Sequence, residues 1–195
     1  MLSLLDEQAI KKEKHTMANL RTGDTALDFT LPATDGQTYN LDDAFKNARA
    51  VAIVFTCNHC PYVRAWEDRI NAIARDYASQ GVRLFGINSN NASAYPADSF
   101  ENMVKRAHEK HFVFPYLYDE SQSVARSYGA ERTPELFIFD ATKTLRYHGA
   151  LDDNYEDEHA VKHHYAREAL DALLAEREPA LPETKPVGCS IKWKP

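Results

Sequence analysis

The sequence predicts an α/β protein whose central sheet contains a parallel pair of strands. Three consecutive segments carry this prediction. Residues 51–55 form an unbroken apolar run, which is typical of a strand buried on both faces. Apolar side chains then recur at helical spacing from Trp66 to Tyr77, Gly81 follows as a stop, and residues 82–87 form a second apolar run. A strand, a helix and a strand in this order predict a βαβ unit with a right-handed crossover.

The segments on either side of this unit complete the predicted sheet. Residues 29–32 and 38–41 flank Asp35-Gly36, a turn pair that tolerates left-handed backbone, and so predict an N-terminal hairpin. An Asn-rich loop starts at Asn88. After it we expect helices over residues 100–107, 121–128 and 161–174, an apolar segment over residues 112–118, and strands over residues 136–139 and 145–148. Because 136–139 and 145–148 pair as a hairpin, the central sheet is expected to be mixed and flanked by helices.

The length of 195 residues suits one domain with extended ends. We expect an N-terminal arm over residues 1–18, disordered or a short surface helix, to which we assign no chemistry. The α/β domain is expected over residues 19–178. The last segment, residues 179–195, is predicted to be an irregular tail that docks on the domain through Ile191 and Trp193.

Charge and hydropathy exclude two classes of partner. The net charge is −6, from 23 basic and 29 acidic residues, without a stripe of Lys and Arg that could neutralise phosphates, so we expect no nucleic acid partner. The apolar runs are far shorter than a membrane span, and residues 1–15 lack the pattern of a secretory signal. We therefore expect a cytoplasmic protein without a membrane partner; the oligomeric state stays open.

The strongest chemical signal is Cys57-Asn58-His59-Cys60, which lies between the first predicted buried strand and its helix. Amides at a helix N-terminus are unpaired and favour an anion, so a Cys57 thiolate at the start of this helix, which we expect near Asn58, is both stabilised and reachable. Cys57 is therefore the candidate nucleophile. Cys60 follows one helical turn later, within reach of a mixed disulfide on Cys57, so the two thiols can cycle between dithiol and disulfide.

His59 adds a second source of positive charge beside the Cys57 thiolate. A stabilised thiolate makes the disulfide more oxidising, which favours the upper part of the range of about −270 to −120 mV for such pairs. A zinc site is the main alternative for a CxxC motif, but it usually needs a second ligand pair, and the only other thiol is Cys189. We therefore predict redox chemistry at Cys57 and Cys60, with no metal and no cofactor.

The assembled motifs resemble the thioredoxin-like superfamily, in particular the peroxiredoxin-like branch of the alkyl hydroperoxide reductase and thiol-specific antioxidant (redoxin) family. The resemblance covers residues 19–195 and is carried by five segments: residues 28–32, residues 57–63, the loop at Asn88, Thr133-Pro134, and residues 188–193. It implies a thioredoxin-like fold with an inserted helix. It also implies a cis bond before Pro134, which would present the backbone of Thr133 as a groove for an extended thiol substrate.

The sequence departs from this family in two ways. True peroxiredoxins carry P-x-x-x-T-x-x-C and a nearby arginine, whereas here Cys57 stands three residues before Cys60 and Arg132 is offset. Reductase-type thioredoxins carry a buried acid beneath the CxxC, whereas residues 51–55 contain no carboxylate. Proton transfer must then use water, His59 or a group from elsewhere.

These departures favour a thiol-disulfide oxidoreductase that acts on protein or small-molecule thiols and disulfides. A thiol peroxidase, which would take peroxide, and a non-catalytic binding module of the same fold remain as alternatives. Cys189 is open in the same way: it is either a third thiol that exchanges disulfides with Cys57 or Cys60, or an inert residue of the docking tail.

Overall fold

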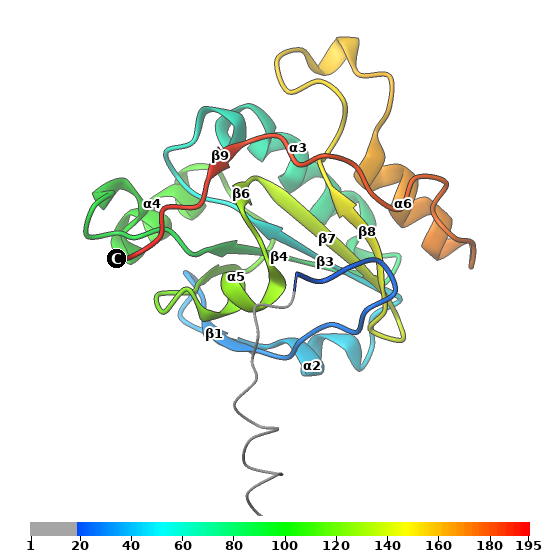
Figure 1. The fold of residues 1–195 in the computed structure, drawn as a ribbon, viewed down its shortest axis with the longest axis horizontal. Helices are drawn as coiled ribbons and strands as arrows, with labels where there is room; N and C mark the ends of the chain where they lie inside the picture. The colour runs from blue at the N-terminus through cyan, green and yellow to red at the C-terminus, as the bar shows by residue number, and fades with distance from the viewer. Residues whose placement is uncertain (1–18) are drawn as a thin grey trace, which may run out of the picture.

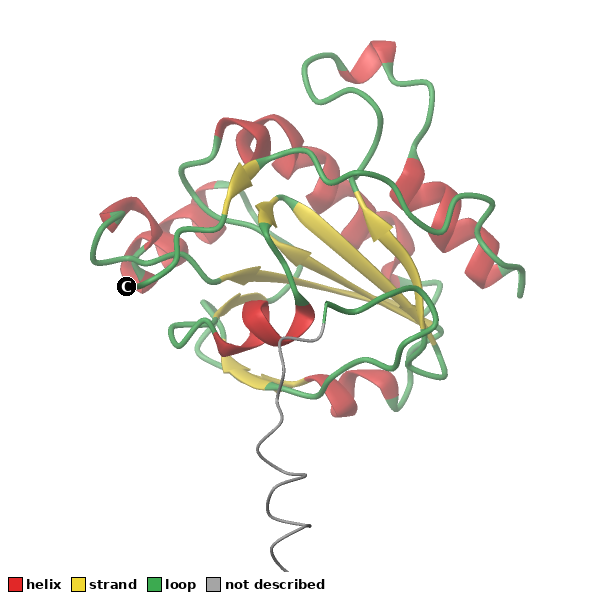
Figure 2. Ribbon diagram, in the orientation of Figure 1, coloured by secondary structure: helices red, strands yellow, loops and turns green. Residues whose placement is uncertain are grey.

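The computed structural model describes residues 19–195, so the predicted N-terminal arm, residues 1–18, lies outside the described residues. Its centre is a five-stranded sheet in the order β5-β4-β3-β7-β8 (Figures 1 and 2). The bounds in that order are Tyr116–Tyr118, Val82–Asn88, Ala50–Phe55, Glu135–Asp140 and Leu145–Gly149. Strands β3, β4 and β5 are parallel, whereas β7 is antiparallel to β3 and to β8. The sheet is therefore mixed, as predicted.

Strand β3 is buried on both faces, which explains its unbroken apolar sequence. Val51, Ile53 and Phe55 contribute to one core cluster, while Ala50, Ala52 and Val54 contribute to the other. The first cluster lies under α2 (Leu41–Phe45) and α5 (Ser123–Tyr128), and the second under α3 (Pro61–Ala78) and α6 (Tyr165–Leu174). Helices therefore cover both faces of the sheet, and β3 is fixed between them.

The N-terminal hairpin is also present. Strands β1 (Thr30–Pro32) and β2 (Thr38–Asn40) pair antiparallel around Gly36, whose φ of 82° is the left-handed backbone expected of the turn. Asn40 then caps α2, because its side chain accepts a hydrogen bond from the amide of Asp43 at 3.0 Å.

An inserted segment follows β4. It consists of the 3₁₀ helix η1 (Pro96–Asp98), α4 (Phe100–Glu109) and β5. The side chain of Ser99 caps α4 by accepting a hydrogen bond from the amide of Asn102. Because β3 and β4 are parallel, the loop after β3 and the loop that leads into η1 emerge at the same edge of the sheet.

Two predicted elements differ in the structure. Helix α6 starts at Tyr165, so Val161 lies before it; Asp153 holds this segment outside the helix by accepting a hydrogen bond from the amide of Lys162. The tail is also not wholly irregular. Its strand β9 (Cys189–Ser190) pairs antiparallel with β6 (Arg132–Thr133), and the C-terminal segment, red in Figure 1, passes beside β6.

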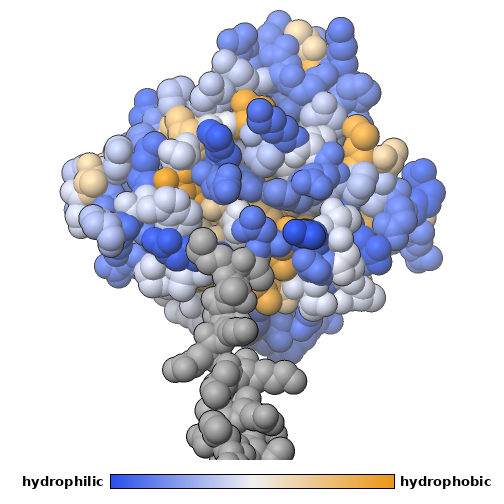
Figure 3. Space-filling view, in the orientation of Figure 1, coloured by the Kyte–Doolittle hydropathy of each residue, from blue (hydrophilic) through white to orange (hydrophobic). Residues whose placement is uncertain are grey.

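The surface in the orientation of Figure 3 is mostly hydrophilic, with hydrophobic residues in small separate groups. Among the described residues, no helix combines the length and the apolar character that crossing a membrane requires.

Candidate active site

Cys57 and Cys60 lie at the carboxyl end of β3, in the turn that leads into α3. Both thiols are buried, with exposed fractions of 3% for Cys57 and 0% for Cys60. Thr133 contacts both sulfurs: its hydroxyl oxygen lies 3.5 Å from Sγ of Cys57, and its carbonyl oxygen accepts a hydrogen bond from Sγ of Cys60 at 3.1 Å. The bond between Thr133 and Pro134 is cis, as the family resemblance implied.

The start of α3 corrects one expectation about Cys57. The helix begins at Pro61 rather than near Asn58, and Cys60 is its N-cap with extended backbone at φ −69° and ψ 125°. Pro61 occupies the first helical position, where a missing N–H costs no helical hydrogen bond. The sulfur at the helix N-terminus is therefore that of Cys60, and Cys57 lies three residues before it.

The ionisation of Cys57 and Cys60 is coupled, and the pKa values of the two thiols shift in opposite directions. The hydrogen bond from Cys57, followed by those from the Cys189 side chain and the amides of Val63 and Cys189, lowers the pKa of Cys60 to about 4 against the opposing effect of burial. The same bond to Cys60, then burial and the charge of Asp98, raises the pKa of Cys57 well above its ordinary value. The opposite shifts favour ionisation of Cys60 over that of Cys57.

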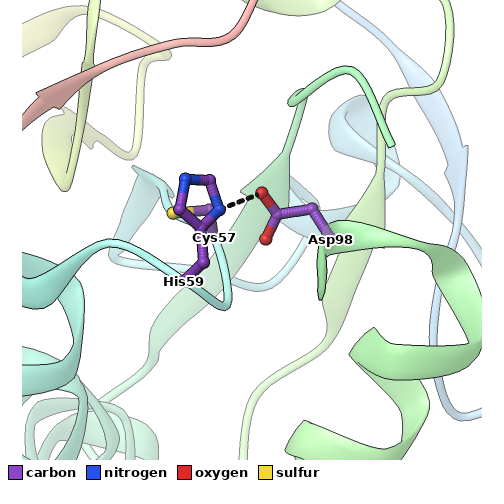
Figure 4. Close-up of side chains that lie close together, drawn as sticks. All are labelled: Cys57, His59 and Asp98. Carbon is purple, nitrogen blue, oxygen red and sulfur yellow. Dashed lines mark hydrogen bonds and ion pairs between the residues drawn. The ribbon is translucent and has the colours of Figure 1, made fainter. Parts of the chain in front are cut away.

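An imidazole and a buried carboxylate adjoin Cys57 (Figure 4). Nδ1 of His59 lies 2.6 Å from Oδ2 of Asp98, whose side chain has no exposed surface. The ring of His59 also stacks on Tyr95 with a centroid distance of 5.2 Å. Since Nδ1 faces the carboxylate, the other ring nitrogen is free of that bond and available for proton exchange.

Hydrogen bonds fix Asp98 in place. Its Oδ1 accepts from the amide of Asn58 at 2.7 Å, and its Oδ2 accepts from Nδ2 of Asn90 at 2.8 Å. Asn58 in turn donates from its side chain to the carbonyl of Ala97 and accepts from the hydroxyl of Tyr116. The turn between the cysteines is thus tied to η1 and β5, so Asp98 positions both the turn and His59.

Asp98 is the site residue that the sequence reasoning missed. Asp98 is close to the sulfurs only in space, because 39 residues separate it from His59. The available signal was the Asn-rich loop, whose members Asn88, Asn90 and Asn91 are all buried. With Ser89 they form four consecutive buried polar residues, which require hydrogen-bond partners, and Asp98 is one of those partners.

Cys57, His59 and Asp98 each offer a ligand atom, and these atoms lie within 4.8 Å of one another. Such a donor set suits a metal such as Zn²⁺ in principle. Both oxygens of Asp98 already accept hydrogen bonds, however, and Nδ1 of His59 is engaged by Asp98. The arrangement fits an oriented imidazole beside a thiol better than a metal centre.

The third thiol also reaches the site. Cys189 pairs with Thr133 in the β6–β9 ladder and packs against the cluster formed by Cys57, Cys60 and Val63. The predicted groove at Thr133 and Pro134 is therefore covered by the tail of the same chain. Arg132 is exposed and donates a hydrogen bond to the carbonyl of Gly188 at 3.2 Å.

A central mixed sheet with helices on both faces, a CxxC turn and a cis-proline opposite it define the thioredoxin-like fold. The family model described as Redoxin matches residues 21–164, so the chain belongs to the Redoxin family.

Three solved structures are similar to this chain. A hypothetical protein from Sinorhizobium meliloti 1021 is 36% identical with a TM-score of 0.85, over 91% of this chain and 97% of that chain. An uncharacterized conserved protein from Geobacillus kaustophilus is 44% identical with a TM-score of 0.82, over 90% and 93%. A putative thiol:disulfide interchange protein DsbE from Chlorobium tepidum is 22% identical with a TM-score of 0.59, over 80% and 97%, and shows the fold alone. The comparison with curated proteins found no match.

Proposed function

We propose that the protein is a thiol-disulfide oxidoreductase whose redox centre is the pair Cys57 and Cys60. One observation carries the proposal: Cys57 and Cys60 pack in one cluster at the start of α3, and Thr133 of the cis-proline turn contacts both sulfurs. Two adjacent thiols, one of them with a lowered pKa, can attack a disulfide and then close a disulfide of their own. Membership of the Redoxin family supports the same class of chemistry.

The proposed cycle has two exchange steps. Sγ of Cys57 attacks one sulfur of a substrate disulfide, the substrate bond breaks, and the departing substrate thiolate takes up a proton. Sγ of Cys60 then attacks Sγ of Cys57, which releases the second substrate thiol and leaves a Cys57–Cys60 disulfide. The substrate gains two electrons and the protein loses two, so the balance closes without a cofactor.

His59 and Asp98 supply the proton transfer in this cycle. When Cys57 attacks, its proton passes to the Cys60 thiolate. When Cys60 attacks in turn, the second ring nitrogen of His59 accepts that proton and gives it to the departing thiolate. Asp98 accepts the hydrogen bond of Nδ1 at 2.6 Å and so orients the ring. This pair takes the role of the buried acid that β3 lacks.

The burial of both thiols supports a second candidate function, a thiol peroxidase. With exposed fractions of 3% and 0%, the pair is more accessible to a molecule as small as a peroxide than to a folded protein. In that reaction one thiolate attacks the peroxide oxygen and becomes a sulfenic acid, which the other thiol condenses to a disulfide with loss of water.

Single-cysteine variants test the proposal. Cys57→Ser should abolish reduction of a small disulfide such as oxidised glutathione, and Cys60→Ser should accumulate a mixed disulfide of Cys57 with glutathione. Mass spectrometry of the intact, acid-quenched protein reads out both results. Full activity in both variants would refute the proposal, and a sulfenic acid that forms with peroxide while oxidised glutathione does not react would favour the peroxidase.

We also propose the cytoplasm as the compartment. The chain contains only three cysteines, too few for the disulfide-stapled scaffolds that are typical of oxidising compartments. Labelling of thiols in intact cells with a permeant and an impermeant alkylating reagent tests this, because only the permeant reagent should reach the protein.

A further inference from the structure

The C-terminal tail is bound to the active site by its backbone. Strand β9 pairs with β6 so that Cys189 lies opposite Thr133 and Ser190 lies opposite Arg132. The amide of Ile191 donates to the carbonyl of Glu131 at 2.9 Å, which extends this pairing by one residue. Ile191 itself is 3% exposed and belongs to the main core cluster.

Further contacts hold the tail beyond β9. Lys192 donates its amide to Oδ1 of Asn90, and its carbonyl accepts hydrogen bonds from the amide of Asn91 and the side chain of Gln122. The guanidinium of Arg126 lies 4.5 Å from the ring centroid of Trp193. The tail is therefore an integral part of this face of the domain.

The register turns the thiol of Cys189 towards the redox pair. Side chains of directly opposed residues in an antiparallel ladder lie on the same face, and the Thr133 hydroxyl lies beside Cys57. Cys189 accordingly packs on the cluster that contains the two buried cysteines. Ser190, the next residue, is exposed on the opposite face.

The close approach depends on Gly188. A Cβ at this position would lie 2.2 Å from the carbonyl oxygen of Thr133 and 3.1 Å from the nitrogen of Pro134. Only glycine leaves room for the chain to come this close to the cis-proline turn.

The three thiols differ in accessibility. Cys57 and Cys60 are buried, whereas Cys189 is partly exposed. An external thiol therefore reaches Cys189 more easily than either member of the pair, and Cys189 packs against the cluster that contains Cys60.

The charges around Cys189 depend on the redox state of the pair. Burial, followed by the hydrogen bond to Cys60 and the charge of Cys60, raises the pKa of Cys189 to about 11, while Lys192 and Arg132 act in the opposite direction. A disulfide between Cys57 and Cys60 removes the anionic sulfur but leaves both cations in place. Cys189 thus ionises more easily once the pair is oxidised.

We propose that Cys189 is a third redox-active thiol, which receives the disulfide from the buried pair and presents it to an external thiol at the surface. This inference rests on the proposed function of the pair. The tail then occupies the groove at Thr133 and Pro134 in the place of an external thiol substrate.

The transfer balances in atoms and electrons. The thiolate of Cys189 attacks Sγ of Cys60, the Cys57–Cys60 bond breaks, and Cys57 takes up a proton from His59 to replace the one that Cys189 released. A first external thiolate then attacks Sγ of Cys189 and frees Cys60. A second attacks the resulting mixed disulfide, which frees Cys189 and yields the external disulfide.

Reduction of the oxidised protein by glutathione tests this transfer of the disulfide through Cys189, which we call the relay. The full chain is oxidised with oxidised glutathione, mixed with glutathione without oxygen, quenched in acid, and mapped by mass spectrometry without reduction. We expect a peptide linked through Cys60 and Cys189 during the reaction. We also expect Cys189→Ser to be reduced at least about tenfold more slowly, because glutathione must then reach a buried disulfide.

The matched control moves the thiol by one residue. The double variant Cys189→Ser, Ser190→Cys keeps three thiols but turns the third away from Cys60, so it should be as slow as Cys189→Ser. The relay is overturned if Cys189→Ser is reduced at the wild-type rate, if the double variant regains that rate, or if no Cys60–Cys189 peptide forms.

The same experiment separates the two proposals. If the Cys57–Cys60 disulfide forms and cycles equally well in wild type and in Cys189→Ser, the relay fails and the function of the pair stands. If that disulfide forms in neither protein, both proposals fail.

Discussion

Asp98 lies 2.6 Å from Nδ1 of His59, although 39 residues separate the two in the sequence. The contact joins the CxxC turn after β3 to the 3₁₀ helix after β4, and it leaves the remaining nitrogen of the imidazole for the thiols. Because Asp98 also accepts the amide of Asn58, one buried carboxylate holds both the turn and the ring. The fold therefore brings a thiol, an imidazole and a carboxylate together from two loops at one edge of the sheet.

Asp98→Asn should slow disulfide exchange by about tenfold or more, because an amide neither orients nor stabilises the protonated ring as a carboxylate does. His59→Gln should have a similar effect, and the double variant should be little slower than either single variant. Rates with oxidised glutathione measure all three.

Asp119→Asn is the matched control for that cycle. Asp119 is equally buried and hydrogen-bonded to Ser89, to Ser121 and to the amide of Ala125, so its substitution removes a comparable carboxylate that has no hydrogen bond to His59 or to a cysteine. It should reduce thermal stability without the loss of rate. Additive effects of His59→Gln and Asp98→Asn would show that the two residues act independently.

The opposite pKa shifts of Cys57 and Cys60 predict a specific pH dependence. Since the pKa of Cys60 is lowered to about 4, its thiolate persists through neutral pH and is protonated only as the pH falls through about 4. Ultraviolet absorbance of the thiolate should report this transition. Cys57→Ala removes the largest cause of the shift and should move the transition towards the ordinary thiol value of about 8.5.

Cys189→Ala provides the comparison for this titration. It removes a smaller contribution to the Cys60 pKa, so its transition should shift upwards less than that of Cys57→Ala. A thiolate that appears only above pH 8 in the wild type would contradict the lowered pKa of Cys60.

Gly188→Ala should detach the tail from the groove, because the new Cβ would collide with the carbonyl of Thr133. Cys57 and Cys60 should then react with N-ethylmaleimide about tenfold faster or more, since reactivity follows access as well as ionisation. Val187→Ala, at an exposed neighbour, is the control. Equal alkylation rates in Gly188→Ala and wild type would mean that the tail does not cover the thiols.

Removal of metal should leave the activity unchanged. The oxygens of Asp98 and Nδ1 of His59 are used in hydrogen bonds, so we expect no metal ion at the group of Cys57, His59 and Asp98. Dialysis against EDTA followed by exchange assays and elemental analysis tests this. Loss of activity on chelation, with recovery on addition of Zn²⁺, would identify a metal site instead.

The central elements were predictable because their signals are local. The apolar run of β3 and the helical spacing from Trp66 to Tyr77 each follow from burial of a single segment, and the structure confirms the mixed sheet. The start of α3 was predicted wrongly. Asn58 uses its amide and side chain to bind Asp98, Ala97 and Tyr116, and these tertiary contacts keep residues 57–60 out of the helix.

The features that the sequence did not reveal depend on contacts between distant segments. Asp98 was one polar residue among many until the fold placed it under His59. Strand β9 contains only Cys189 and Ser190, which is too short for an alternating pattern. Its pairing depends on the backbone of β6 at Thr133 and on the absence of a side chain at Gly188. Such pairings require the assembled domain before they can be recognised.

The central claim is that Cys57 and Cys60 form a reversible disulfide. Its most direct test is a redox titration of the wild-type chain in glutathione buffers, with alkylation of free thiols and peptide mapping. We predict a reversible two-electron transition that links Cys57 to Cys60, with a potential in the upper part of the range of about −270 to −120 mV. Free Cys57 and Cys60 thiols at every potential would contradict it and would leave a thioredoxin-like module that binds without exchanging disulfides.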